Sequence, residues 1–297
     1  MKLVSILKDG DRVAGVLEGD DVFVTAVPGL DIAIAQRIEL KGEAGRWTKL
    51  KQLTLDVPLR PGSLLCTGSN YRDHLEERVP ASGGLNAPPK ELEFFVKAGQ
   101  TIAPLDAPLR LDPAFGRKID QETELGIVMR PGCVRKIPEE RARSYIFGYL
   151  VVNDLTAREK QVRLLPDGSN FMVLGASKNF DGSTRLSSYV VTADEVEDID
   201  NVAIKTYLND KLTQNNSTRN LINRLERAIS FFSEGLTLQP AGIISTGTPG
   251  GTGWGQDREL RGTGYLPPGC SPGRYLRAGD VVRSVVEGVG EIVFHVE

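Results

Sequence analysis

The chain has 297 residues, 40% hydrophobic and 25% charged, so it is long enough to bury a large core without disulfides or metal staples. Its 36 lysines and arginines against 39 aspartates and glutamates give a net charge of −3, which argues against nucleic-acid binding through a basic surface. The sequence has no apolar run near the roughly 20 residues that cross a bilayer, and its three scattered cysteines are typical of reduced thiols, so we expect a cytoplasmic protein without a membrane anchor.

The first 60 residues are predicted to form a small β-rich amino-terminal domain, followed by a larger domain over residues 61–297. Short apolar stretches between Asp-Gly and Gly-Asp-Asp turns predict strands at 3–7, 13–17 and 22–24, and a helix is predicted at 32–40. Two prolines and a glycine at 57–62 mark the join. The amino-terminal part shows no chemistry of its own.

Strands also dominate the larger domain. They are predicted at 63–67, 122–129, 147–153 and 243–245, with a hairpin at 281–296. A helix is predicted over 221–232, with Ser217 or Thr218 as its N-cap and Gly235 as its end. Residues 78–92 are rich in Pro, Gly and Ala, which is typical of a mobile loop. This order of elements predicts an α+β fold that is mainly β.

Two glutamates in one predicted strand are candidate metal ligands. Glu122 and Glu124 are two residues apart, so on a strand their side chains project from the same face. Burying two carboxylates so close together costs free energy unless a cation compensates them. Asp154, at the end of another apolar strand, could be a third ligand. An isolated Glu-x-Glu also fits the solvent-facing side of an edge strand, so both readings stay open at this point.

The chain contains only two histidines, His74 and His295. His74 is three residues before Glu77, so on a helix the two side chains share a face. A carboxylate beside an imidazole orients the ring and raises its basicity, which suits a general base acting on water. A surface helix with a chance His-x-x-Glu is the alternative. His295 lies in the terminal valine-rich strand and is interpreted as structural.

A glycine-rich turn follows the strand predicted at 243–245. Its sequence, TGTPGG over 246–251, exposes backbone N–H groups that could hold a carboxylate or an oxyanion, although a simple tight turn has the same composition. The P-loop, the dinucleotide fingerprint and the Gly-x-Ser-x-Gly elbow are absent from the sequence. These absences argue against nucleotide chemistry and against a serine hydrolase of the elbow type.

The order of these motifs and their residues together resemble the fumarylacetoacetate hydrolase family over about residues 62–297. The matching segments are GSNYRDHLEE at 68–77, FFVK at 94–97, ETEL at 122–125, FGY at 147–149, NDLTAR at 153–158, SKNFD at 177–181 and TGTP at 246–249. The resemblance implies a mixed β-sandwich roll and a homodimer. It also implies a divalent metal, Mg²⁺ or Mn²⁺ with Ca²⁺ as a further option, held by Glu122, Glu124 and Asp154.

The resemblance further implies roles for individual side chains. His74 and Glu77 would activate water, and Lys178 would stabilise developing negative charge. The substrate contacts it implies are Arg72, Gln161, Gly247 and Thr248. Residues 78–92 occupy the position of the family's lid. The stretch 254–278 is longer than the common family loop and contains four arginines, one of which could bind a substrate carboxylate.

On this resemblance we expect a metal-dependent hydrolase that cleaves a C–C bond of a small β-diketo acid or acylpyruvate, from sugar-acid or aromatic breakdown. A lyase or isomerase acting on the same class of 2-oxo acid is the alternative, for example an oxaloacetate-type decarboxylase or a 2-oxo-dienoate hydratase. The His74–Glu77 pair favours water activation, because simple decarboxylation needs no nucleophile. A third possibility is a metal-binding protein that kept the fold without catalysis.

Overall fold

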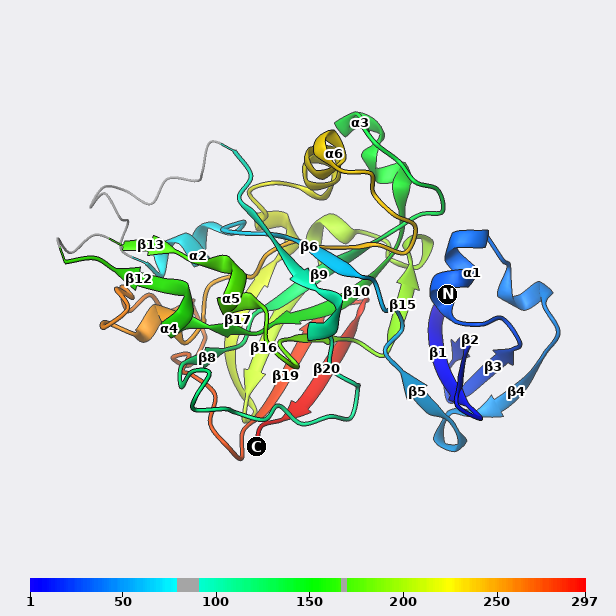
Figure 1. Cartoon of the computed structure of the whole chain (residues 1–297), viewed down its shortest axis with the longest axis horizontal. Helices are drawn as coiled ribbons and strands as arrows, with labels where there is room; N and C mark the ends of the chain where they lie inside the picture. Colours follow the sequence, from blue (N-terminus) through cyan, green and yellow to red (C-terminus); the bar gives the residue numbers. More distant parts are fainter. Residues whose placement is uncertain (79–90, 167–169) are drawn as a thin grey trace.

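A computed structural model describes residues 1–78, 91–166 and 170–297 (Figure 1). In these residues strands outnumber helices and form two main sheets, so the predicted α+β, mainly β class is confirmed. The predicted loop at 78–92 falls almost entirely on residues outside the described part. No helix within the described ranges is long and apolar enough to span a bilayer.

The amino-terminal part contains five strands, one short α-helix and two 3₁₀ turns. The strands and the α-helix are β1 (Lys2–Lys8), β2 (Asp11–Glu18), β3 (Asp21–Thr25), α1 (Leu30–Gln36), β4 (Gly45–Lys49) and β5 (Thr54–Asp56). The helix is shorter than the predicted 32–40, because Arg37 adopts the left-handed conformation with φ 59° and ends it.

The larger of the two main sheets joins the amino-terminal strands to strands of the rest of the chain. Its further strands are β6 (Ser63–Thr67), β7 (Phe94–Ala98), β9 (Thr123–Met129), β10 (Ile146–Asp154), β14 (Thr184–Leu186), β15 (Tyr189–Thr192) and β18 (Ile243–Ser245). The order is β4-β3-β2-β1-β15-β10-β9-β18-β6-β7, with β5 and β14 paired to β1 and β10. Leu3 of β1 lies opposite Val190 of β15, so the sheet continues across the join predicted near residue 60.

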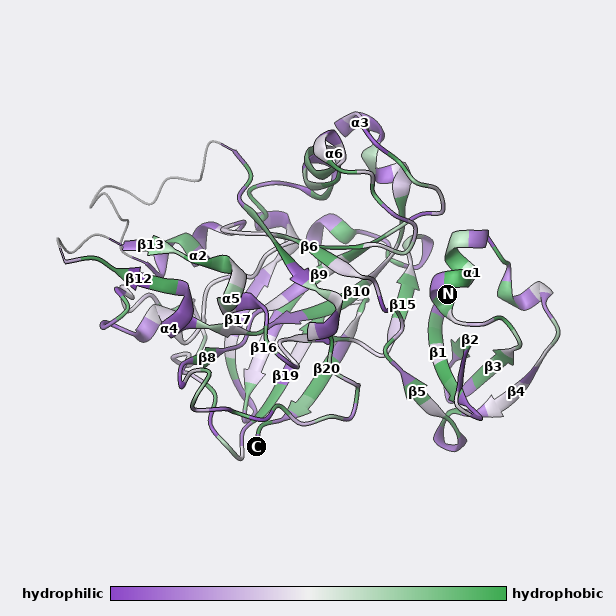
Figure 2. Ribbon diagram, in the orientation of Figure 1, coloured by the Kyte–Doolittle hydropathy of each residue, from purple (hydrophilic) through white to green (hydrophobic). Residues whose placement is uncertain are grey.

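A second sheet covers the central strands. It consists of β16 (Ala203–Leu208), β17 (Lys211–Ser217), β19 (Val281–Val286) and β20 (Gly290–His295), and the last two form the predicted terminal hairpin. Its apolar side chains, such as Ile204 and Phe294, join Leu125 and Val151 in one buried cluster. Figure 2 shows hydrophobic residues along several of the sheet strands, β1 among them. A buried polar group also lies between the two sheets, where Thr123 is hydrogen-bonded to Thr206 and Ser284.

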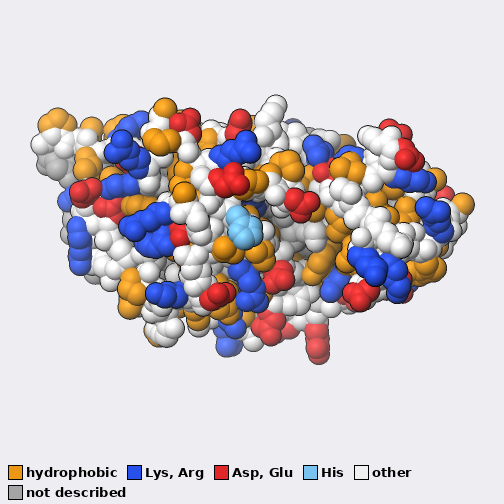
Figure 3. Space-filling model, turned by 90° about the horizontal axis from the view of Figure 1, so that it is seen from below, with side chains coloured by type: hydrophobic (Ala, Val, Ile, Leu, Met, Phe, Trp, Pro, Cys, Tyr) orange, Lys and Arg blue, Asp and Glu red, His pale blue; other side chains and the backbone are white. Residues whose placement is uncertain are grey.

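Helices and short strands surround these sheets. They are α2 (Arg72–Glu76), β8 (Ile119–Asp120), α3 (Glu139–Ala142), β11 (Thr156–Ala157), α4 (Arg158–Gln161), β12 (Val162–Leu164), β13 (Asn170–Met172), α5 (Leu174–Lys178) and α6 (Leu225–Gly235). Basic and acidic side chains alternate over the face shown in Figure 3, as the balanced composition leads one to expect.

The helix predicted from residue 221 begins four residues later than expected. The predicted cap Ser217 instead accepts a hydrogen bond from the amide of Arg219 in a separate 3₁₀ turn. The amide of Ile222 donates to the carbonyl of Asn70 at 2.9 Å. Because this segment pairs with the chain before α2, its amides are not available to a helix.

Candidate metal centre and active site

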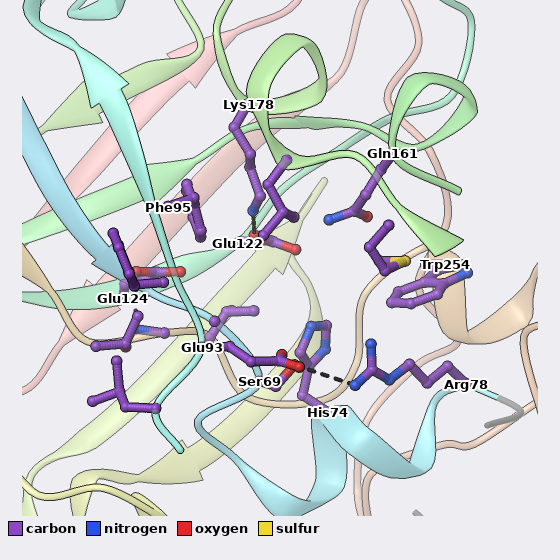
Figure 4. A pocket seen from close by; sticks show the side chains of 18 residues that line it. Ser69, His74, Arg78, Glu93, Phe95, Glu122, Glu124, Gln161, Lys178 and Trp254 are labelled. Carbon is purple, nitrogen blue, oxygen red and sulfur yellow. Dashed lines mark hydrogen bonds and ion pairs between the residues drawn. The ribbon is translucent and has the colours of Figure 1, made fainter. Parts of the chain in front are cut away.

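One cavity of about 340 Å³ lies where three strands of the large sheet meet (Figure 4). Strands β6 and β18 are parallel and end at this edge, whereas β9 is antiparallel to β18 and starts here. The residues just after β6, around the start of β9 and just after β18 therefore face one space. Segments 67–69, 122–124 and 247–248 contribute lining residues to it.

Three carboxylates cluster at this cavity: Glu122 and Glu124 line it, and Asp154 is fully buried beside them. Glu122 and Glu124 lie at the start of β9, and Asp154 is the last residue of the neighbouring strand β10. The amide of Asp154 donates to the carbonyl of Glu122 at 2.9 Å. One ligand oxygen from each of the three lies within 4.8 Å of the others. All three side chains are buried, and β9 lies between β10 and β18, so the alternative of a solvent-facing edge strand is wrong.

Cationic side chains compensate two of the three carboxylates. Lys178 Nζ donates to both Glu122 and Asp154, and Lys97 Nζ donates to Asp154 at 2.7 Å. Arg158 Nη2 also donates to Glu122. Burial alone would raise the pKa of Glu122, but the charges of Arg158 and Lys178 hold that pKa well below its usual range.

Glu124 differs from the other two carboxylates. In the described structure its hydrogen-bond donors are neutral: the Ser245 hydroxyl and the amide of Gly247, at 3.0 Å. Burial and the nearby charge of Asp154 raise the pKa of Glu124. All three candidate ligands are carboxylates, and Glu124 has no cationic hydrogen-bond donor among the described residues. Such a site fits a hard divalent cation such as Mg²⁺ or Mn²⁺.

His74 and Glu77 form a pair on the opposite wall, in which Glu77 is fully buried and His74 is partly exposed. The His74 ring borders the cavity, and its Nδ1 lies 2.6 Å from Glu77 Oε2. Glu77 also accepts from the amides of Gly251 and Thr252, at 2.7 and 2.8 Å, and from the Thr252 hydroxyl at 2.9 Å. Burial raises the pKa of Glu77, while the hydrogen bond from His74 acts in the opposite direction. Because a carboxylate can only accept, Glu77 favours the His74 tautomer that carries its proton on Nδ1. Nε2 of that tautomer is a hydrogen-bond acceptor.

Four other predicted residues lie around the same cavity. They are Lys178, Gln161, Gly247 and Thr248. Gln161 directs its amide group into the space (Figure 4) while its Oε1 accepts from Arg158 at 2.7 Å. Thr248 Oγ1 is bonded to the carbonyl of Thr123 at 3.1 Å.

Arg72 does not face this cavity. It is exposed and lines a separate surface hollow with Asp73 and Glu76. The reason is helical geometry: residues two apart in α2 point in nearly opposite directions, so the helix that turns His74 inward turns Arg72 outward. The described arginine that lines the cavity from this segment is Arg78, whose Nη2 donates to Ser69 at 3.3 Å. Of the arginines in 254–278, Arg274 is paired with Asp280.

The family model for the carboxy-terminal domain of fumarylacetoacetate (FAA) hydrolase matches residues 50–297. The chain belongs to the fumarylacetoacetate hydrolase family. This agrees with the resemblance in the sequence motifs and with the mainly β fold.

Individual proteins of known sequence or structure are also similar to this chain. An uncharacterised protein of Staphylococcus haemolyticus is 30% identical over 236 residues, covering 80% of this chain and 69% of that protein. A fumarylacetoacetate hydrolase from Exiguobacterium antarcticum is 26% identical with a TM-score of 0.77, covering 100% of this chain and 99% of that one. A 5-carboxymethyl-2-hydroxymuconate delta-isomerase from Mycobacterium smegmatis is 26% identical with a TM-score of 0.72 and covers 100% and 98%. The fold thus serves both hydrolases and isomerases.

Sequence reasoning missed three charged residues that shape this family site. Arg158, Lys97 and Asp120 are buried, and none was among the predicted site residues. Two of them stand inside the recognised motifs NDLTAR and FFVK. The available signal was electrostatic: three buried acids require cations nearby, and these motifs supply them.

Proposed function

We propose that the protein is a metal-dependent hydrolase that cleaves a C–C bond of an acylpyruvate-type β-diketo acid. The observation that carries this proposal is the position of the His74–Glu77 pair. The His74 ring faces the cavity that Glu122 and Glu124 line, and Asp154 lies in the same acid cluster as these two glutamates. A metal-binding acid cluster and a general base on opposite walls are the two parts that hydrolysis of such a bond requires.

A divalent cation held by Glu122, Glu124 and Asp154 would supply Lewis acidity, stabilising the enolate of the departing pyruvate half. The chain supplies the remaining functions. Lys178 Nζ, at the same acid cluster, places a positive charge beside the substrate's anionic end. Gln161 offers an amide group to a substrate oxygen.

Proton transfer is assigned to His74. Its Nε2 takes a proton from a water molecule, whose oxygen attacks the carbonyl remote from the carboxylate. Glu77 stabilises the resulting imidazolium, and its four hydrogen bonds keep the ring in one orientation. The ring then returns the proton to the enolate carbon as the C–C bond breaks, which gives pyruvate and a carboxylic acid.

An isomerase is the second candidate, because a solved relative at 26% identity is a delta-isomerase. An isomerase would use the same enolate and the same His74, moving a proton between carbons without water. The third possibility, metal binding without catalysis, would leave the orientation of His74 toward the acid cluster without a use.

Product analysis separates these candidates. The purified protein is incubated with acetylpyruvate, oxaloacetate and a 2-oxo-dienoate, with Mg²⁺ or Mn²⁺ and with a chelator. Mass spectrometry should show pyruvate and acetate from acetylpyruvate, only with metal, and no turnover in a His74→Gln variant. A product of unchanged mass would indicate the isomerase, and loss of CO₂ the decarboxylase. Absence of metal-dependent turnover on all three would refute the proposal.

A further inference from the structure

Four successive backbone amides, at residues 251–254, all donate to buried carboxylates. Those of Gly251 and Thr252 donate to Glu77 Oε1 at 2.7 and 2.8 Å. Those of Gly253 and Trp254 donate to the two oxygens of Asp120 at 2.8 and 3.0 Å. A single short segment of chain therefore holds two carboxylates that are 43 positions apart in the sequence, Glu77 and Asp120. We call residues 251–254 the bridge.

The two carboxylates serve different halves of the proposed active site. Glu77 orients His74. Asp120 accepts a hydrogen bond from Arg158 Nε at 2.9 Å. Nη2 of the same arginine donates to Glu122, a candidate metal ligand. One end of the bridge thus supports the water-activating base, and the other end supports the guanidinium that orients a carboxylate of the acid cluster.

The Trp254 side chain contacts both halves as well. Its ring lies edge-on to the His74 ring, with centroids 6.1 Å apart, and the guanidinium of Arg158 lies over it at 5.0 Å. Trp254 Nε1 donates to the carbonyl of Leu260 at 2.9 Å, which fixes the orientation of the indole. The indole is buried and borders the cavity.

Close packing leaves the bridge little room to move. A Cβ on Gly251 would lie 1.9 Å from the carbonyl oxygen of Thr213, and Gly251 has φ +107°. A Cβ on Gly255, directly after the bridge, would lie 2.7 Å from Glu77 Oε1. Because the backbone is in contact on both sides, a displacement at one end is transmitted to the other rather than absorbed.

We propose that the bridge couples the His74–Glu77 pair to the metal site, with Asp120 and Trp254 as positioning residues. The inference rests on the proposed function for its role in turnover. The coupling itself is a property of the protein without substrate. Outer partners that orient metal ligands typically contribute about 10- to 100-fold to metal affinity, so a disturbance that crosses the bridge should be measurable by binding alone.

The first test disturbs the Glu77 end without changing charge. Gly255→Ala adds one methyl group against Glu77, and Gly235→Ala is the matched control because nothing lies within 4 Å of its Cβ. Mn²⁺ affinity is measured by calorimetry, and the state of His74 by ¹⁵N NMR of the metal-free protein, with the exposed His295 as internal reference. We expect Gly255→Ala to shift the His74 signal and to weaken Mn²⁺ binding by about tenfold or more.

The second test disturbs the other end. Asp120→Glu keeps the negative charge but moves the carboxylate relative to the amides of 253 and 254, so a changed His74 signal cannot arise from lost charge. We expect both a weaker Mn²⁺ affinity and a shifted His74 signal. If Gly255→Ala fails to fold, Thr252→Val takes its place, because it replaces the hydroxyl bonded to Glu77 with a methyl group and changes no charge.

The outcomes are decisive. Cross-effects in both directions support the coupling. The inference is overturned if the Glu77-side variant leaves Mn²⁺ affinity at the level of Gly235→Ala, or if the Asp120 variant leaves His74 unchanged. No substrate is used, so lack of turnover on every 2-oxo acid would refute the proposed function while this test still gives its own answer.

Discussion

The pair that orients the general base gives the sharpest prediction. In Glu77→Gln the amide oxygen is best placed at Oε1, where it still accepts from the amides of Gly251 and Thr252. The NH₂ group then takes the place of Oε2, 2.6 Å from His74 Nδ1, and needs an acceptor there. His74 must therefore carry its proton on Nε2, the nitrogen that should accept a proton from water.

The corresponding change in a Ser-His-Asp triad lowers turnover by about 10⁴-fold, or about 5.4 kcal/mol. We expect a loss of that order in kcat for Glu77→Gln on acetylpyruvate with saturating Mn²⁺. Mn²⁺ affinity should fall by less than about tenfold, because the hydrogen bonds to Oε1 and hence the bridge are kept. Turnover is followed by the ultraviolet absorbance of the enol, and the tautomer of His74 by ¹⁵N NMR. Turnover within about tenfold of wild type would refute the reasoning.

Three further predictions concern charge. Lys178→Ala should lower kcat by at least about 10²- to 10³-fold, as loss of one oxyanion donor does, whereas the exposed Lys211→Ala should match wild type; near-full turnover would remove Lys178 from the mechanism. Glu124→Gln should abolish Mn²⁺ binding in calorimetry, and an unchanged dissociation constant would overturn its assignment as a ligand. Asp56 is buried, and although burial raises its pKa, the Arg60 guanidinium holds it below its usual range. Its stabilising effect is therefore complete above the unfolded pKa of about 3.9 and disappears as the pH falls through the lower folded value. Asp56→Asn should cost about 1–3 kcal/mol at pH 7 and less at pH 3 in denaturant unfolding; an equal cost at both pH values would contradict this.

The strands of the fold could be predicted largely from alternation and turn residues. The predicted strand at 63–67 coincides with β6, and the one at 243–245 with β18. The sequence alone could not show which strands lie next to each other in the sheet. Whether Glu122 and Glu124 lie on an edge or inside the sheet depends on β18, more than 100 residues further along the chain.

Local geometry explains why Arg72 lies apart from the other predicted site residues. Arg72 and His74 belong to one motif, but residues two positions apart in a helix point in nearly opposite directions, and here His74 faces the cavity. The buried cations Arg158 and Lys97 were missed for a different reason. Their importance arises from charge balance among segments that meet only in the folded chain. The homodimer, and the division into two domains near residue 60, stay predictions.

The buried ion pairs beside the cavity have a consequence for the order of folding and metal binding, if a cation binds there. Glu122, Asp154 and Asp120 are each bonded to at least one of Lys97, Lys178 and Arg158. Most of the negative charge there is thus matched from within the polypeptide, and folding does not have to wait for a cation. A divalent cation would then bind to a site that the folded chain has already formed.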